Sequence, residues 1–299
     1  MAHRHSRRTL GPGVSTVGAI ARTTAAATAT PRFGDLLRQW RVARRLSQLM
    51  LATEAEISSR HLSFLETGRA QPSREMVLLL ADVLDVPLRE QNALLTAAGY
   101  ASIHRETELG APELGQVRKA LGFMLAQQEP FPAVVVDRHW NVLMQNDGAQ
   151  RVFGLFLEPE AVAALGTPAN VVRLTFHPRG LRQFIVNWEA LAGPLVQQIH
   201  REAVGGIPDE GTRRLLDEVL SYPGVPARWR APDASAQSAP YLAIALRKGD
   251  LAARFFTTIA SLGTPQDVTL QELRIECFFP ADDATEAFAR RLAGPPDQP

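Results

Sequence analysis

The segment Leu46–Ser73 has the pattern of two short helices joined by a tight turn. Ser47 can cap the first helix and Ser58 the second, because a serine hydroxyl accepts a hydrogen bond from the free N–H groups of a helix's first turn. The second helix is predicted to end at Gly68. Apolar residues recur at helical spacing after each serine: Leu51, Ala52, Ala55, Leu62 and Leu65. This layout predicts a helix-turn-helix unit.

Helical periodicity continues on both sides of this unit. Before it, one face of a further helix carries Phe33, Leu36, Leu37, Trp40 and Ala43. After it, Pro72 and Ser73 open a fourth helix, and Pro87 starts a fifth that runs to Gly99. We therefore expect residues 33–101 to form an all-α, five-helix domain around the helix-turn-helix.

Composition narrows the functional classes. The chain has 299 residues, so more than one domain is expected. Its net charge of only +1 argues against a sequence-blind polycation, so any contact with nucleic acid must come from a local basic patch. The single cysteine, Cys277, excludes an intrachain disulfide. No apolar run reaches the roughly 18 residues needed to cross a bilayer. We expect a soluble, cytoplasmic protein without a membrane partner.

Residues 1–32 form a basic segment in which no acidic residue occurs. We expect a disordered arm, because the segment contains Gly-Pro-Gly and a Thr/Ala tract interrupted by Arg22. A tail without a role is favoured over one that contacts DNA phosphates. An export signal around Arg7 and Arg8 is a weaker alternative, because the residues that follow form no unbroken apolar core.

The rest of the chain mixes helix and strand patterns. Residues 102–115 are polar and broken by Pro and Gly, which predicts a linker. Residues 116–291 are expected to form an α+β domain, followed by a flexible tail over residues 292–299. Helices are predicted over residues 117–128, 149–156, 181–202 and 211–221, and strands over residues 131–137, 140–144, 241–247, 251–259 and 270–279.

A helix-turn-helix reads DNA by placing its second helix in the major groove. The outward positions near the start of that helix, predicted to face bases, are Ser59, Arg60, Ser63 and Phe64. Arg60 could donate hydrogen bonds to O6 and N7 of a guanine, and Phe64 could contact a thymine methyl group. Phosphate contacts are predicted for Gln48, Arg41, Arg45 and Arg69. On spacing alone, an ordinary helix pair of an α bundle is as good an interpretation.

Residues 33–100 resemble the lambda-repressor/Cro-type (XRE) helix-turn-helix family. The resemblance is carried by Leu46–Ala52, Ile57–Ser58, Leu62–Gly68 and Pro72–Ser73. It implies that Gln48 anchors a phosphate, that Ser59, Arg60 and Phe64 face bases, and that Glu66 supports the fold. Glu56 stands in the turn where the family usually has glycine.

The second domain resembles the MmyB-like regulators. The resemblance is carried by Asp137–Asn146, Arg173–Pro178, Asn187–Glu189, Tyr222–Trp229 and Thr264–Val268. It implies a PAS-like fold that holds a small apolar ligand such as a fatty acid. Asn187 stands where the family usually has aspartate.

A ligand pocket is typically apolar with a few convergent polar groups. The ligand-binding residues predicted here are Phe176, His177, Phe184, Trp188 and Arg173. His177 or Arg173, or the nearby Arg182, could receive a carboxylate. For any single one of these residues, a packing or capping role is the more common alternative.

No catalytic motif stands out. The sequence lacks a Gly-rich phosphate loop, a nucleophile elbow and a Cys/His cluster with metal spacing. We therefore expect no enzyme, no metal and no cofactor beyond a possible bound ligand. The hypothesis is a homodimeric, sequence-specific DNA-binding transcription regulator that senses a small apolar ligand. One alternative is a helix-turn-helix that binds protein, attached to a non-sensing dimer, and a weaker one is an enzyme with a helix-turn-helix appended.

Overall fold

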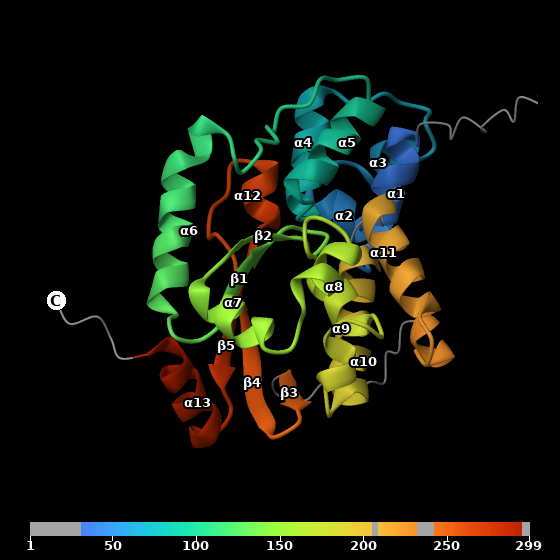
Figure 1. Ribbon diagram of the computed structural model, residues 1–299. Coiled ribbons are helices and arrows are strands. Elements are labelled where there is room, and N and C mark those ends of the chain that lie inside the picture. Colours follow the sequence, from blue (N-terminus) through green and yellow to red (C-terminus); the bar gives the residue numbers. More distant parts are fainter. Residues whose placement is uncertain (1–30, 205–208, 232–241, 295–299) are drawn as a thin grey trace, which may run out of the picture. The chain divides into compact units, whose positions relative to one another are not determined.

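The computed structural model describes residues 31–204, 209–231 and 242–294 (Figure 1). Of the arm predicted over residues 1–32, all but the last two residues lie outside these ranges. Residues 295–299 of the predicted tail also lie outside them. Leu292 and Ala293 belong to the last helix, α13 (Asp283–Ala293), so folded structure continues past the point where the tail was expected to begin.

The amino-terminal domain contains the five expected helices. They are α1 (Phe33–Ala43), α2 (Gln48–Glu54), α3 (Ser59–Glu66), α4 (Arg74–Val83) and α5 (Leu88–Ala97). Their apolar faces meet in one core, in which Trp40, Leu62 and Leu80 are almost completely buried. The helical spacing of apolar residues therefore predicted both the elements and the core of this domain.

Local chemistry fixes the helix ends around the turn. The Ser47 and Ser58 hydroxyls each accept a hydrogen bond at 3.1 Å, from the backbone N–H groups of Met50 and His61 respectively. Gly68 follows α3 with a φ of +72°, which a glycine adopts without strain. Both predicted caps and the predicted end of the second helix are thus confirmed.

The carboxy-terminal domain contains one antiparallel five-stranded sheet with the order β2-β1-β5-β4-β3. Its strands are β1 (Ala133–Val136), β2 (Val142–Gln145), β3 (Ala243–Lys248), β4 (Leu251–Ala260) and β5 (Arg274–Pro280). In the register of β1 and β5, Val134 pairs with Glu276 and Val136 with Arg274. Since side chains alternate across a strand, Glu276 and Phe278 face the same side as Val134.

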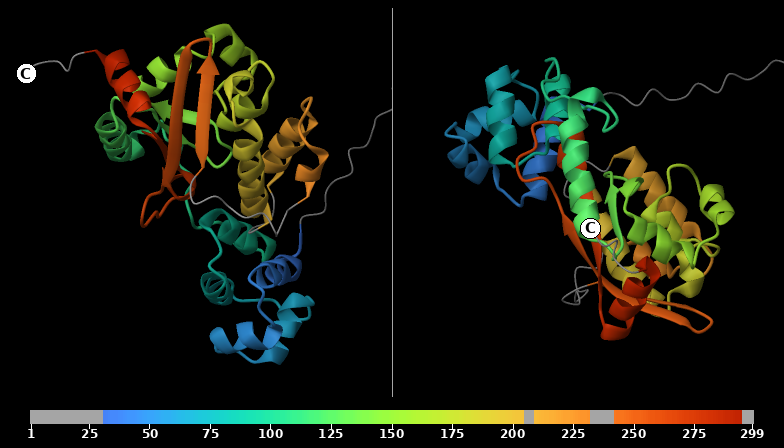
Figure 2. Two further views of the ribbon diagram at one scale, coloured as in Figure 1. Left: turned by 90° about the horizontal axis from the view of Figure 1, so that it is seen from below. Right: turned by 60° about the vertical axis from the view of Figure 1, so that its left-hand side comes forward.

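Helices cover the two faces of this sheet unequally (Figure 2). On one face, α6 (Gly115–Gln127) packs on Ala133, Val135 and Ile275. The other face carries the larger core. Its helical elements are α7 (Asp147–Gly154), α8 (Pro159–Ala164), α9 (Val171–Phe176), η2 (Leu181–Phe184), α10 (Trp188–Val204), α11 (Glu210–Ser221), η3 (Ala227–Arg230) and α13. A short η1 (Pro112–Leu114) precedes α6.

Several expected elements need correction. The strand predicted over residues 270–279 begins only at Arg274, because α12 (Val268–Glu272) comes first and is capped by the Asp267 carboxylate. The helix predicted over residues 181–202 is divided into η2 and α10. Helices α8, α9 and α13 were not predicted, since two of them have only six residues, too few to show a helical period. None of the helices in the described ranges has the length and hydropathy of a membrane span.

Candidate DNA interface and ligand cavity

Helix α3 and the loop that follows it present a surface of two cations around one aromatic ring. Ser59 and Arg60 are exposed, whereas Ser63 and Phe64 are half-buried. The Arg60 guanidinium lies 5.3 Å from the centre of the Phe64 ring, and that of Arg69 lies 6.0 Å from the same ring. The structure therefore brings Arg60, Phe64 and Arg69 together.

Arg41 does not belong to this surface. Its side chain is 12% exposed and that of Glu66 only 3%, with Arg41 Nε and Glu66 Oε1 2.6 Å apart. The same guanidinium donates to the Leu46 carbonyl at 2.9 Å. The hydrogen bond to Glu66 raises the pKa of Arg41 above its ordinary value, so the guanidinium stays charged in this ion pair. The predicted phosphate contact of Arg41 is corrected to a structural ion pair, and Glu66 supports the fold as the resemblance implies.

The other predicted phosphate residues keep donors available. Gln48 Nε2 donates to Glu66 Oε2 at 2.7 Å, which uses one of its two hydrogens and leaves the second at the start of α2. Arg45 and Arg69 are exposed. Their charges lie on loops, just before α2 and just after α3, where a groove-bound helix pair meets the DNA backbone.

In the turn between α2 and α3, Glu56 has a backbone conformation that glycine adopts more readily than other residues. Glu56 has a φ of +52°, the left-handed region that side chains with a Cβ rarely adopt. The residue is exposed, so its side chain meets no core atom. Glu56 therefore adopts, in this turn, a backbone conformation that favours glycine.

The carboxy-terminal domain encloses a cavity of about 480 Å³ between its sheet and its larger helical layer. Apolar side chains dominate the lining, among them Phe153, Leu174, Leu195, Ile244 and Phe278. This size falls within the range of small-molecule sites, and the apolar lining favours an apolar ligand.

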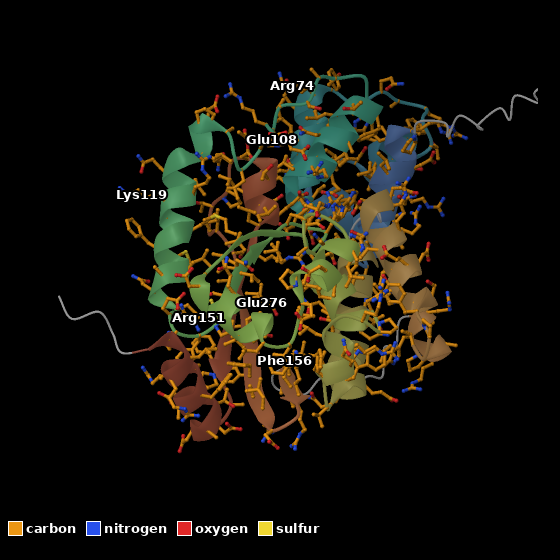
Figure 3. The ribbon with its side chains drawn as sticks, in the orientation of Figure 1. Arg74, Glu108, Lys119, Arg151, Phe156 and Glu276 are labelled. Carbon is orange, nitrogen blue, oxygen red and sulfur yellow. The ribbon has the colours of Figure 1, made fainter. Side chains whose placement is uncertain are left out.

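Two side chains that line this cavity each carry a buried polar atom without a hydrogen-bond partner among the described residues. Glu276 is 7% exposed and Trp140 is 2% exposed. The Glu276 Oε2 and Trp140 Nε1 atoms make no hydrogen bond within the part of the chain that the structure describes. Burial raises the pKa of the Glu276 carboxyl to about 7, although the charge of Arg274 opposes this rise. Figure 3 shows the Glu276 side chain in the interior of the domain.

The five predicted ligand residues do not line this cavity. Phe176 is fully buried against Trp188, with ring centres 5.7 Å apart. Arg173 Nε donates to the Glu218 carboxylate at 2.9 Å. These three residues therefore serve packing and ion pairing around α9.

The remaining two lie at the edges of the same region. His177 ends α9, and its ring packs edge-on against Tyr222 at 5.0 Å. The Phe184 ring lies 5.8 Å from that of Phe156. None of the five expected ligand residues thus belongs to the lining, whereas the lining residues Trp140 and Glu276 were not predicted. One signal existed for Glu276, since it is an acid in the middle of an otherwise apolar strand pattern.

Charged residues link the cavity side of the domain to helix α5. Arg138, two residues before Trp140, donates to Glu272 at 2.8 Å and to Asp209 at 2.9 Å. Glu272 also accepts a hydrogen bond from Arg89 of α5 at 2.7 Å. The loop that carries Trp140 is therefore joined to the DNA-binding domain through shared carboxylates. No group of three or more metal-ligating side chains occurs among the described residues.

Comparison with known proteins supports both domains. The model of a helix-turn-helix domain matches residues 32–94, and that of the MmyB-like transcription regulator ligand binding domain matches residues 117–292. A search among curated proteins found no match.

A solved structure described as an RNA-binding light-oxygen-voltage receptor is 12% identical, with a TM-score of 0.26 over 87% of this chain, which spans 61% of that chain. So low a score carries no argument. The second family model covers more than half of the sequence and confirms the resemblance drawn from its motifs: the chain belongs to the MmyB-like transcription regulators.

Proposed function

We propose that this protein is a cytoplasmic, sequence-specific transcription regulator of the XRE type whose DNA affinity changes when a small apolar ligand enters the carboxy-terminal cavity. The surface of α3 carries the DNA part of the proposal. Exposed Arg60 of α3 and exposed Arg69 of the loop after it flank Phe64, on a helix that starts at a serine cap and follows a tight turn. A guanidinium beside an apolar ring suits a guanine next to a thymine methyl in the major groove.

Ligand control needs a physical link between the cavity and the DNA-binding domain. Trp140 lines the cavity, and Arg138 in the same loop shares Glu272 with Arg89 of α5. A ligand that moves this loop would favour one arrangement of the ion-pair network over another. A difference in affinity of roughly 1–3 kcal/mol between the two arrangements is enough for a useful switch. A fatty acid is among the candidate ligands, as the resemblance of this domain implies.

A homodimer is part of the same proposal. One helix-turn-helix makes few base contacts, so useful specificity requires two half-sites about 34 Å apart or a multiple of that. Helix α6 exposes Phe123 and Met124, which are 60% and 40% exposed and suit burial against a second copy. The PAS-like description of the domain also belongs to the proposal, supported by the five-stranded antiparallel sheet with its larger helical layer on one face.

Selection from random duplexes of about 30 base pairs tests this function directly. The full-length chain should enrich one sequence arranged as two related half-sites, and the Arg60→Ala variant should lose preference at one position of each half-site. Enrichment of no sequence, with or without added ligand, would favour the protein-binding alternative for the helix-turn-helix.

A further inference from the structure

Phe64 is an aromatic residue of the amino-terminal domain that does not contribute to the domain core. Phe33 and Trp40 belong to the buried core cluster, and Tyr100 packs against it. Among the described residues, neither group includes Phe64, which is half-buried. A surface aromatic ring keeps a large apolar area available for contact with another molecule. Phe64 is therefore a candidate for recognition.

The position of Phe64 on α3 accounts for its exposure. Leu62 and Leu65 lie on one face of the helix, and both are almost completely buried. Arg60 and Phe64 are four residues apart and share another face, since an α-helix has about 3.6 residues per turn. This face, on which Arg60 is exposed, is directed away from the core.

Two guanidinium groups lie against the Phe64 ring. That of Arg60 is 5.3 Å and that of Arg69 is 6.0 Å from the ring centre. No ion pair within the described ranges involves either arginine. The backbone N–H of Arg69 also donates to the Phe64 carbonyl at 2.8 Å, which holds the loop beside the ring. The ring therefore orients two cations whose donors remain available to a partner.

The chemistry of the major groove suits this combination of groups. Its apolar feature is the C5-methyl group of thymine, and guanine presents the acceptors O6 and N7, which arginine binds through two hydrogen bonds. The Arg60 guanidinium and the Phe64 ring lie against each other. The bases that the two side chains reach are therefore neighbours.

We propose that α3 recognises the C5-methyl group of a pyrimidine next to a guanine, with Phe64 contacting the methyl group and Arg60 donating to the guanine. This inference rests on the proposed function for the placement of α3 in the major groove. Thymine and 5-methylcytosine carry the same methyl group at the same ring position, whereas uracil and cytosine lack it. The protein therefore responds to methylation of a cytosine at this position.

The alternative role for Phe64 is support of the two arginines alone. In that role the ring would hold the guanidinium groups in place without contacting a base. Removal of the ring would weaken DNA binding in either role. Removal of the methyl group from the DNA would weaken binding only if Phe64 contacts it, so the test must change the DNA.

Fluorescence anisotropy of the full-length protein with four duplexes tests the inference. Each duplex carries the selected site with the guanine at which Arg60→Ala loses its preference. The neighbouring pyrimidine is thymine, uracil, cytosine or 5-methylcytosine, so the methyl group is the only difference within each of two pairs. We expect binding to weaken about fourfold from thymine to uracil and to tighten about fourfold from cytosine to 5-methylcytosine, the factor for burying one methyl-sized group.

The Phe64→Ala variant tests the ring itself. It should abolish both methyl effects, and circular dichroism should show a folded protein because Phe64 lies outside the core cluster. The control is Leu79→Ala, which removes a 41% exposed apolar side chain from α4, outside the helix-turn-helix, and should leave both effects unchanged. The comparison of the four duplexes in the unmutated chain needs no variant and stands even if Phe64→Ala fails to fold.

Three results would overturn the inference. They are an Arg60→Ala variant that loses no guanine preference beside a thymine, equal binding within either pair of duplexes, and methyl effects that persist in folded Phe64→Ala. A specific site without a methyl effect refutes the inference and leaves the proposed function intact. A selection that enriches no sequence refutes the proposed function, and the inference with it.

Discussion

The Arg41 guanidinium holds the Glu66 carboxylate through two hydrogen bonds, Nε to Oε1 at 2.6 Å and Nη2 to Oε2 at 3.0 Å. Both side chains are nearly buried, and the pair joins the helix that precedes the helix-turn-helix to the end of α3. Breaking a buried pair by removing one partner leaves a charge uncompensated. The orientation of the DNA-facing helix therefore depends on this ion pair.

Arg41→Ala should lower the free energy of unfolding by on the order of 3 kcal/mol. It should leave the salt dependence of DNA binding by the folded protein nearly unchanged, because no phosphate contact is lost. Arg69→Ala, at an exposed position, should leave the free energy of unfolding nearly unchanged. It should reduce the slope of log K against log salt by about 0.9. Urea unfolding and fluorescence anisotropy measure the two effects. A stable Arg41→Ala protein with a reduced salt slope would return Arg41 to the DNA surface.

Glu56→Gly should stabilise the protein. Glu56 has a φ of +52°, and releasing a side chain from that region recovers about 1 kcal/mol, partly offset by the greater freedom of glycine in the unfolded chain. The control is Arg38→Gly in the middle of α1, which should destabilise by about 1 kcal/mol. Thermal unfolding followed by circular dichroism reports both. Destabilisation by Glu56→Gly would mean that the Glu56 side chain makes a stabilising contact in solution.

Arg60→Ala should relax specificity at one base position and cost about 1–3 kcal/mol on the selected sequence. Arg60 lies against Phe64, so the same change also frees that ring, and preference at the neighbouring position should weaken less. Binding to single-base variants of the selected site measures this. Uniform weakening on every sequence would assign Arg60 to a phosphate.

Glu276 should make stability depend on pH. Burial raises its pKa from the ordinary 4.5 to about 7, so its contribution to stability is complete below pH 4.5 and is lost as the pH rises through 7. Glu276→Gln has no such titration. Its stability relative to the unmutated protein should therefore increase by about 2 to 3 kcal/mol between pH 5 and pH 8.

Urea unfolding of both proteins at the two pH values gives this difference, and effects of other titrating groups cancel in it. Glu160→Gln, at an exposed position, should show no pH-dependent difference. A constant difference between Glu276→Gln and the unmutated chain would show that Glu276 is solvated or paired in solution.

Sequence alone predicted the amino-terminal domain well because its information is local. Serine caps, apolar spacing and Gly68 each act within a few residues, and the structure reproduces them. The role of Arg41 was not visible, because its partner Glu66 lies 25 positions away and only packing brings the two together. The position of Arg41 in the sequence is compatible with a phosphate contact and equally with an ion pair to the buried Glu66.

The cavity of the carboxy-terminal domain escaped prediction for a related reason. Aromatic residues such as Phe176 and Trp188 are conspicuous in the sequence, but they pack on one another beside the cavity. The space itself lies between the sheet, in which β5 pairs with β1, and the helices that pack on that face. A cavity forms where side chains from several distant segments leave a volume unfilled. The periodicity of a single segment does not contain this information.

The most direct test is the binding of the full-length protein to DNA from upstream of its own gene, followed by fluorescence anisotropy at two salt concentrations and against scrambled DNA. Specific binding that weakens steeply with salt, with a slope near −0.9 per contacted phosphate, is the predicted result. Equal affinity for both DNAs at each salt concentration would contradict a sequence-specific regulator acting at its own promoter.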